Sequence, residues 1–153
     1  MTRRYRSAVR IEGTKRFRAP RERVFRALTD PYELSELMPG VQRVELKSDD
    51  EWIAVVKPPF GRGLNLKLDL RVTDRREPDH ARLVAWGKSF GARISIETEF
   101  ELIEDGDTTD MAWTADVGLA GLLGGRGGKA LEPAARHQAE RAMERLRRRV
   151  EES

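Results

Sequence analysis

Few side chains in this chain of 153 residues could do acid–base or metal chemistry. There are two histidines and no cysteine. His80 stands beside an expected turn, and His137 lies within a helical segment. Neither has a second ligand at a spacing typical of zinc sites, so we interpret both as solvated. A Ser-His-Asp triad would need one of them, and no nucleophile elbow is present. We expect no catalytic residue, no metal site and no cofactor.

Acidic residues gather just before the last expected hairpin. Glu97, Glu99 and Glu101 alternate along an expected strand. Alternate residues of a strand share one face, so these carboxylates lie together on the outer side. A solvated sheet face explains them better than a metal site or an acid–base pair.

A glycine-rich run covers residues 118–128. It does not fit a phosphate-binding loop, because Leu123 stands where the pattern requires glycine and Ala130 where it requires Ser or Thr. The run has neither strand nor helix periodicity. It is either a flexible hinge or a mobile gate to whatever lies beneath the next helix, and the candidate gate residues are Gly118, Gly121, Gly124 and Gly125.

Arginines gather near the end of the chain as Arg147, Arg148 and Arg149. They are either a solvated helix end, favoured by the helix dipole, or a patch that docks on an anionic membrane surface. The net charge is only +3, and no aromatic residues are interleaved with the basic ones. We therefore expect no nucleic-acid partner.

The elements that would position these residues begin with a helix pair between strands. Ala19-Pro20 precedes the first helix, and Asp30-Pro31 ends it and caps the second. Pro39-Gly40 then turns the chain back into strand. Alternating or apolar stretches predict strands at 7–17, 42–46, 52–57, 64–73, 81–88, 93–102 and 111–117. Residues 129–152 have helical periodicity with one apolar stripe, so the chain is predicted to be α+β.

The motifs A-P, V-F-x-x-L-x-D-P and L-M-P-G-V, in this order, resemble the START-like (SRPBCC) superfamily, and within it the family of the carbon monoxide dehydrogenase G subunit. The matching residues are Ala19, Pro20, Val24, Leu28, Asp30, Pro31, Pro39, Gly40 and Val41. Phe25 stands where the family usually has Trp. The resemblance implies a helix-grip fold, β-α-α-β6-α, in which a curved antiparallel sheet wraps around a long C-terminal helix. We expect one domain over residues 1–153.

The expected interior contains aromatic residues, leucines and a methionine on strands, opposite alanines on the last helix. Small residues there either bring helix and sheet together in a packed core or leave a void; the resemblance favours a void. An apolar void suits a hydrophobic ligand. Its expected lining is Leu37, Phe60, Leu66, Leu68, Trp86, Ile96, Thr98, Phe100, Met111, Trp113, Ala135, Ala139 and Ala142.

We therefore expect a non-enzymatic protein that binds a lipid or quinone-like molecule. The resemblance further implies a membrane-associated accessory of a carbon monoxide dehydrogenase-type oxidoreductase. Two alternatives stay open: a polyketide cyclase-like START enzyme, and a chaperone-like adaptor with a filled core. No apolar run is long enough for a membrane span or a signal segment, so we expect a cytoplasmic protein. The arginine patch and the resemblance leave open a peripheral position at the inner face of the membrane.

Overall fold

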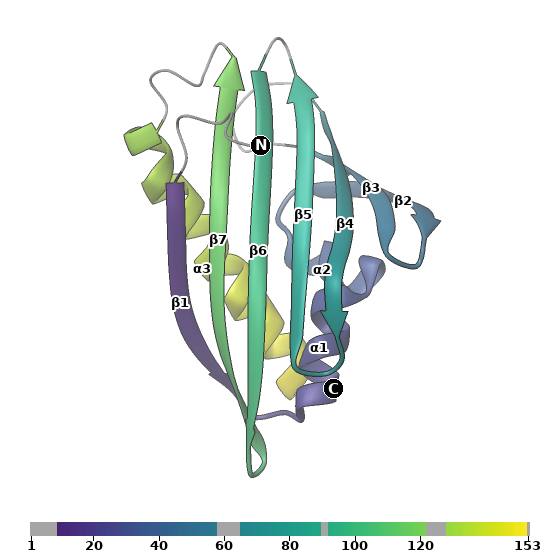
Figure 1. The fold of residues 1–153 in the computed structure, drawn as a ribbon, viewed down its shortest axis with the longest axis vertical. Helices are drawn as coiled ribbons and strands as arrows, with labels where there is room; N and C mark the ends of the chain where they lie inside the picture. Colours follow the sequence, from purple (N-terminus) through teal and green to yellow (C-terminus); the bar gives the residue numbers. More distant parts are fainter. Residues whose placement is uncertain (1–8, 58–64, 90–91, 122–127, 153) are drawn as a thin grey trace.

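A computed structural model describes residues 9–57, 65–89, 92–121 and 128–152. Seven strands form one antiparallel sheet in the order β1-β7-β6-β5-β4-β3-β2 (Figure 1). In chain order the elements are β1 (Val9–Phe17), α1 (Arg21–Thr29), α2 (Pro31–Leu37), β2 (Val41–Ser48), β3 (Glu51–Val56), β4 (Leu66–Arg76), β5 (His80–Ser89), β6 (Ala92–Asp105), β7 (Thr108–Gly121) and α3 (Gly128–Glu151). The predicted β-α-α-β6-α order is confirmed.

The helix pair begins and ends where the prolines and Asp30 predict. Asp30 leaves the helical region at the end of α1, since it precedes a proline. Its side chain then caps α2 by accepting hydrogen bonds from the backbone N–H groups of Tyr32 and Glu33. Asp30 thus ends α1 and caps the start of α2, so the chain changes direction between the two helices at this residue.

The long helix α3 crosses the inner side of the curved sheet (Figure 1). It packs chiefly along β1 and against α1 and α2. Leu146 and Val150 of its predicted stripe are buried, and Ala135 and Ala139 pack against the core. His137 is exposed on the opposite side, as the helical period requires.

The end of β7 lies further along the chain than the sequence predicts. Strand β7 continues to Gly121, because Gly118 pairs with Ser95 and Gly121 pairs with Ala92 of β6. The run 118–121 is therefore strand rather than irregular backbone. The pairing depends on main-chain groups, which a side-chain pattern rich in glycine does not reveal.

Gly13 of β1 marks a close approach of a side chain to the backbone. Its register with β7 is regular, and it pairs directly with Trp113. A Cβ added at Gly13 would lie 3.1 Å from the Trp113 ring. Glycine at this position lets the indole lie across β1.

Candidate functional site

The inner side of the sheet is sealed where the three helices meet. Buried side chains from α1, α3 and the strands pack together there, and none of the largest is more than 2% exposed. This group contains Phe17, Val24, Phe25, Trp52, Leu70, Met111 and Leu146. No bound molecule is needed to fill this part of the interior.

Elsewhere on the inner side, apolar side chains are only half-buried. On β4–β6 these are Leu66, Leu83, Ile94 and Ile96, with Thr98 nearby. On α3 they are Ala135, Ala139 and Met143. These residues contact the core but keep part of their surface accessible, in the region of β4–β6 that α3 does not pack against closely.

The residues predicted to line a cavity therefore divide into two groups. Leu37, Leu68, Phe100, Met111 and Trp113 are buried in the core. The half-buried group contains Leu66, Ile96, Thr98, Ala135, Ala139 and Ala142. Phe60 lies outside the described residues.

The prediction that Trp86 lines the interior is wrong. Trp86 pairs with Asp69 and Ser95, whose side chains lie on the outer side of the sheet. The guanidinium carbon of Arg71 lies 5.6 Å from the centre of its ring. Strand β5 carries apolar residues on both faces, so alternation could not assign them. The neighbouring inner residue is Gly87, whose ideal Cβ position lies against the backbone of Lys67.

The four candidate gate residues are not one loop. Gly118 and Gly121 belong to β7, where their backbones pair with β6. Gly124 and Gly125 lie outside the described residues. The hinge hypothesis is therefore wrong for the first two glycines, whose backbone the strand pairing restrains.

The arginine triplet does not present free positive charge. Arg147 forms ion pairs with Glu144 and Glu151, and Arg148 lies 3.7 Å from Glu144. Consecutive residues of a helix point in different directions, so the triplet divides among several partners rather than forming one patch.

Arg149 belongs to a charged junction of the three helices. Its Nε donates to Oε1 of Glu33 at 2.9 Å, and Arg23 of α1 donates to the same oxygen at 2.8 Å. Arg149 also pairs with Glu36. Burial alone would raise the pKa of Glu33, but the hydrogen bonds from Arg149 and Arg23 together lower it. The junction therefore holds α2 against α1 and α3 with an ionised carboxylate.

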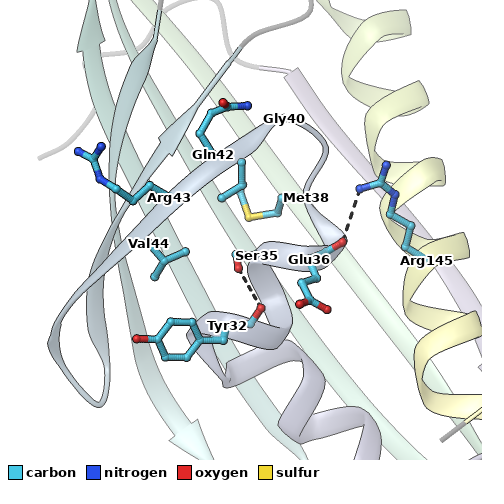
Figure 2. Close-up of a pocket in the computed structure, with 10 residues that line it drawn as sticks. Tyr32, Ser35, Glu36, Met38, Gly40, Gln42, Arg43, Val44 and Arg145 are labelled. Carbon is cyan, nitrogen blue, oxygen red and sulfur yellow. Dashed lines mark hydrogen bonds between the residues drawn. The ribbon is translucent and has the colours of Figure 1, made fainter.

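A hollow of about 380 Å³ lies between α2, the start of β2 and α3 (Figure 2). Met38 and Val44 provide apolar surface, and Arg145 of α3 closes one side by donating to the backbone oxygen of Glu36 at 3.5 Å. Sequence reasoning did not find this hollow, because its walls come from three separate elements.

His80 is not solvated, contrary to the prediction from sequence. It is 5% exposed, and its ring nitrogens face carboxylates of β4 and β6. His80 and Glu101 are paired across β5 and β6. The partners are separated along the chain and meet only through strand pairing, which is why spacing did not reveal them.

None of the helices within the described residues is both long enough and apolar enough to span a bilayer.

Solved structures share this architecture. A conserved protein from Geobacillus kaustophilus has a TM-score of 0.79 at 21% identity, over 93% of this chain and 95% of that chain. A START superfamily protein from Mycobacterium smegmatis gives 0.70 at 15% identity, over 94% and 97%. The di-domain ARO/CYC BexL from the BE-7585A biosynthetic pathway gives 0.65 at 13% identity, over 94% of this chain and 50% of that chain. No curated protein matches the sequence significantly.

The sheet, the helix pair and the long C-terminal helix thus define a START-like (SRPBCC) fold, as the solved structures show. The family model of the carbon monoxide dehydrogenase G subunit (CoxG) matches residues 13–151. The chain belongs to this CoxG family.

Proposed function

We propose that this protein binds a hydrophobic small molecule, such as a lipid or a quinone, between α3 and strands β4–β6, without catalysing a reaction. The observation that carries the proposal is the half-buried apolar surface on both sides of this region. Several apolar side chains contact the core but remain partly exposed: Leu66, Ile94 and Ile96 on the sheet, and Ala139 and Met143 on the helix. Covering such surface with an apolar ligand contributes roughly 25 cal/mol per Å².

The polar groups available support binding over catalysis. Among the described inner-face positions of β1, β5, β6 and β7, the titratable side chains are Lys15 and Glu104. Nζ of Lys15 lies 3.9 Å from Glu144 of α3, and Glu104, at the end of β6, lies 3.5 Å from Arg21 of α1. A cyclase would need an acid–base pair facing its substrate, whereas Thr98 offers only a hydroxyl to orient a ligand. The structural similarity to BexL therefore supports a shared fold, and it is not an argument for a shared reaction.

Membership of the family supports an accessory role beside a carbon monoxide dehydrogenase-type oxidoreductase. Contact with an anionic membrane belongs to the same proposal, but it cannot rest on the arginine triplet. Residues that already pair with Glu144, Glu151, Glu33 and Glu36 offer little net charge to a surface.

The test is a matched pair of polar substitutions on neighbouring strands. Ile96→Gln places an amide on the inner side of β6, whereas Val84→Gln places one on the outer side of β5, and both residues are half-buried. Binding of a long-chain quinone is measured by quenching of tryptophan fluorescence, and native mass spectrometry identifies any co-purified lipid. We expect Ile96→Gln to weaken binding at least about tenfold, a cost of about 1.4 kcal/mol, and Val84→Gln to leave it unchanged.

Two results would contradict the proposal. One is a wild-type protein that neither carries an apolar molecule nor responds to any quinone or fatty acid tried. The other is equal binding by the two variants, which would place the ligand away from the inner side of the sheet.

A further inference from the structure

His80 is the one histidine of the described residues that is buried, and it lies on the outer side of the sheet, away from the proposed ligand region. It is the first residue of β5 and stands between β4 and β6. Around it are Asp74 of β4 and Glu99 and Glu101 of β6. Each of these carboxylates is more exposed than the imidazole, whose side chain is 6% exposed.

The contact with Glu101 indicates which nitrogen of the His80 ring carries the hydrogen. Nδ1 lies 2.7 Å from Oε2 of Glu101. An ionised carboxylate only accepts hydrogen bonds, so Nδ1 carries the hydrogen and donates it. In the neutral ring, Nε2 then carries a lone pair.

That lone pair faces two more acceptors. Nε2 lies 3.1 Å from Oδ2 of Asp74 and 3.5 Å from Oε2 of Glu99. Three acceptors cannot stabilise one another, so a positive species belongs between them: a second proton on His80 or a metal cation. Arg76 lies 3.5 Å from the same Asp74 oxygen. Arg82 donates to Glu97, and the charges of Glu99 and Asp74 also contribute to raising its pKa. These guanidinium groups offset part of the negative charge from the side, but the described contacts of Nε2 are with the two carboxylates.

The spacing of the three atoms suits a metal. They lie within 4.8 Å of one another. Ligand atoms held about 2.0–2.1 Å from a tetrahedral zinc ion are roughly 3.3 Å apart, close to the two distances measured from Nε2. The contact between Glu101 and Nδ1 completes the usual arrangement in which a carboxylate orients a metal-binding histidine through its other nitrogen.

We propose that Asp74, His80 and Glu99 bind a divalent transition-metal ion, with zinc as the best match, and that Glu101 positions His80. One nitrogen and two carboxylate oxygens form a donor set that zinc and cobalt accept. A hollow of about 380 Å³ adjoins His80, Glu99 and Glu101 on the outer side and provides room for water as a fourth ligand. The ion would join β4, β5 and β6.

The experiment titrates chelator-treated protein with zinc by calorimetry and with cobalt by visible absorption. We expect one ion per chain and a cobalt spectrum of tetrahedral intensity. Asp74→Asn, His80→Gln and Glu99→Gln should weaken zinc binding at least about tenfold, and Glu101→Gln should weaken it about 10–100-fold by releasing the orientation of His80.

The chain provides two matched controls. His137→Gln removes the exposed histidine of α3, and Glu97→Gln removes the next outer carboxylate of β6, which pairs with Arg82 at 2.7 Å. Neither should change zinc affinity. Thermal unfolding without metal confirms that each variant is folded.

Absence of binding by the wild type would overturn the proposal. Loss of binding in Glu97→Gln or His137→Gln equal to that in Glu99→Gln would also overturn it, because the ion would then bind non-specifically. Quinone binding is measured on the same variants and should be unaffected, so this result is independent of the proposed function.

Discussion

Gly13 shows how one missing side chain shapes the interior. Its ideal Cβ position lies 3.1–3.2 Å from three atoms of the Trp113 indole, and Trp113 itself pairs with Phe100 of β6. A larger residue at this position would displace the ring from its place across β1. The glycine thus controls where the largest inner side chain of β7 lies.

We predict that Gly13→Val destabilises the protein by about 1–3 kcal/mol, since the added methyl groups overpack the space that the indole occupies. The measurement is urea unfolding followed by circular dichroism. Thr14→Val is the matched control, because Thr14 is exposed on the opposite face, and it should change the free energy of unfolding by less than about 0.5 kcal/mol. Equal stability of wild type and Gly13→Val would show that Trp113 has room to move.

Among the elements, the three helices are connected by the junction around Glu33. Arg23 and Arg149 donate to one carboxylate, whose side chain is 18% exposed. Glu33 and Arg149 are 116 positions apart in the sequence, and only the packing of α3 against α1 and α2 brings them together. The junction therefore reports on whether α3 is docked.

The pKa of Glu33 is lower in the folded protein than its ordinary value. A carboxyl with a lowered folded pKa contributes stability that is present above its unfolded pKa, near 4.5, and is lost as pH falls toward the folded pKa. We predict that Glu33→Gln lowers stability at pH 7 by about 1–3 kcal/mol, since two guanidinium groups lose a charged acceptor. Urea unfolding at several pH values measures this.

The difference between wild type and Glu33→Gln should shrink as pH falls below about 4.5, because the unfolded chain then binds a proton on Glu33 that the folded protein binds only at lower pH. Glu45→Gln on β2 is the control, since Glu45 is exposed and its pair with Arg43 lies within one strand. A difference that stays constant with pH would mean that the junction does not depend on the charge of Glu33.

For the whole molecule, the question is whether the region between α3 and β4–β6 is filled by the protein or by a ligand. Ala139 and Ala135 are half-buried on the helix, opposite half-buried isoleucines and leucines. Among the strands, α3 packs mainly against β1 at the edge of the sheet (Figure 1). A larger residue on this side of α3 would therefore destabilise the protein if the region is a packed core, but would be tolerated if it is a binding cavity.

We predict that Ala139→Leu keeps the free energy of unfolding of the lipid-free protein within about 1 kcal/mol while weakening quinone binding, because leucine fills space that the ligand would occupy. A filled core would instead lose about 1–3 kcal/mol by overpacking. Thermal unfolding with and without quinone measures both effects. Arg141→Leu on the exposed side of α3 is the control for helix propensity, and it should change neither the free energy of unfolding nor quinone binding.

Local sequence patterns were sufficient to predict the order of elements and much of the inner face. Prolines, glycines and Asp30 mark the ends of helices by local backbone preferences, and alternation assigns β4, β6 and β7 correctly because one face of each is buried. These signals act over a few residues and do not depend on distant partners. The family motifs also lie in this helix pair and its flanking turns, between Ala19 and Val41.

The sites, in contrast, depend on contacts that form only in the folded chain. Trp86 lies on the outer face of the sheet, contrary to the prediction, because β5 carries apolar residues on both faces and only its pairing with β4 and β6 assigns them. Strand packing brings His80 to Asp74, Glu99 and Glu101, and helix packing brings Arg149 to Glu33. The arginine triplet, which looks free in the sequence, is paired with carboxylates in the folded protein. The long-range pairs among these form only when packing brings the partner within reach, which local patterns do not show.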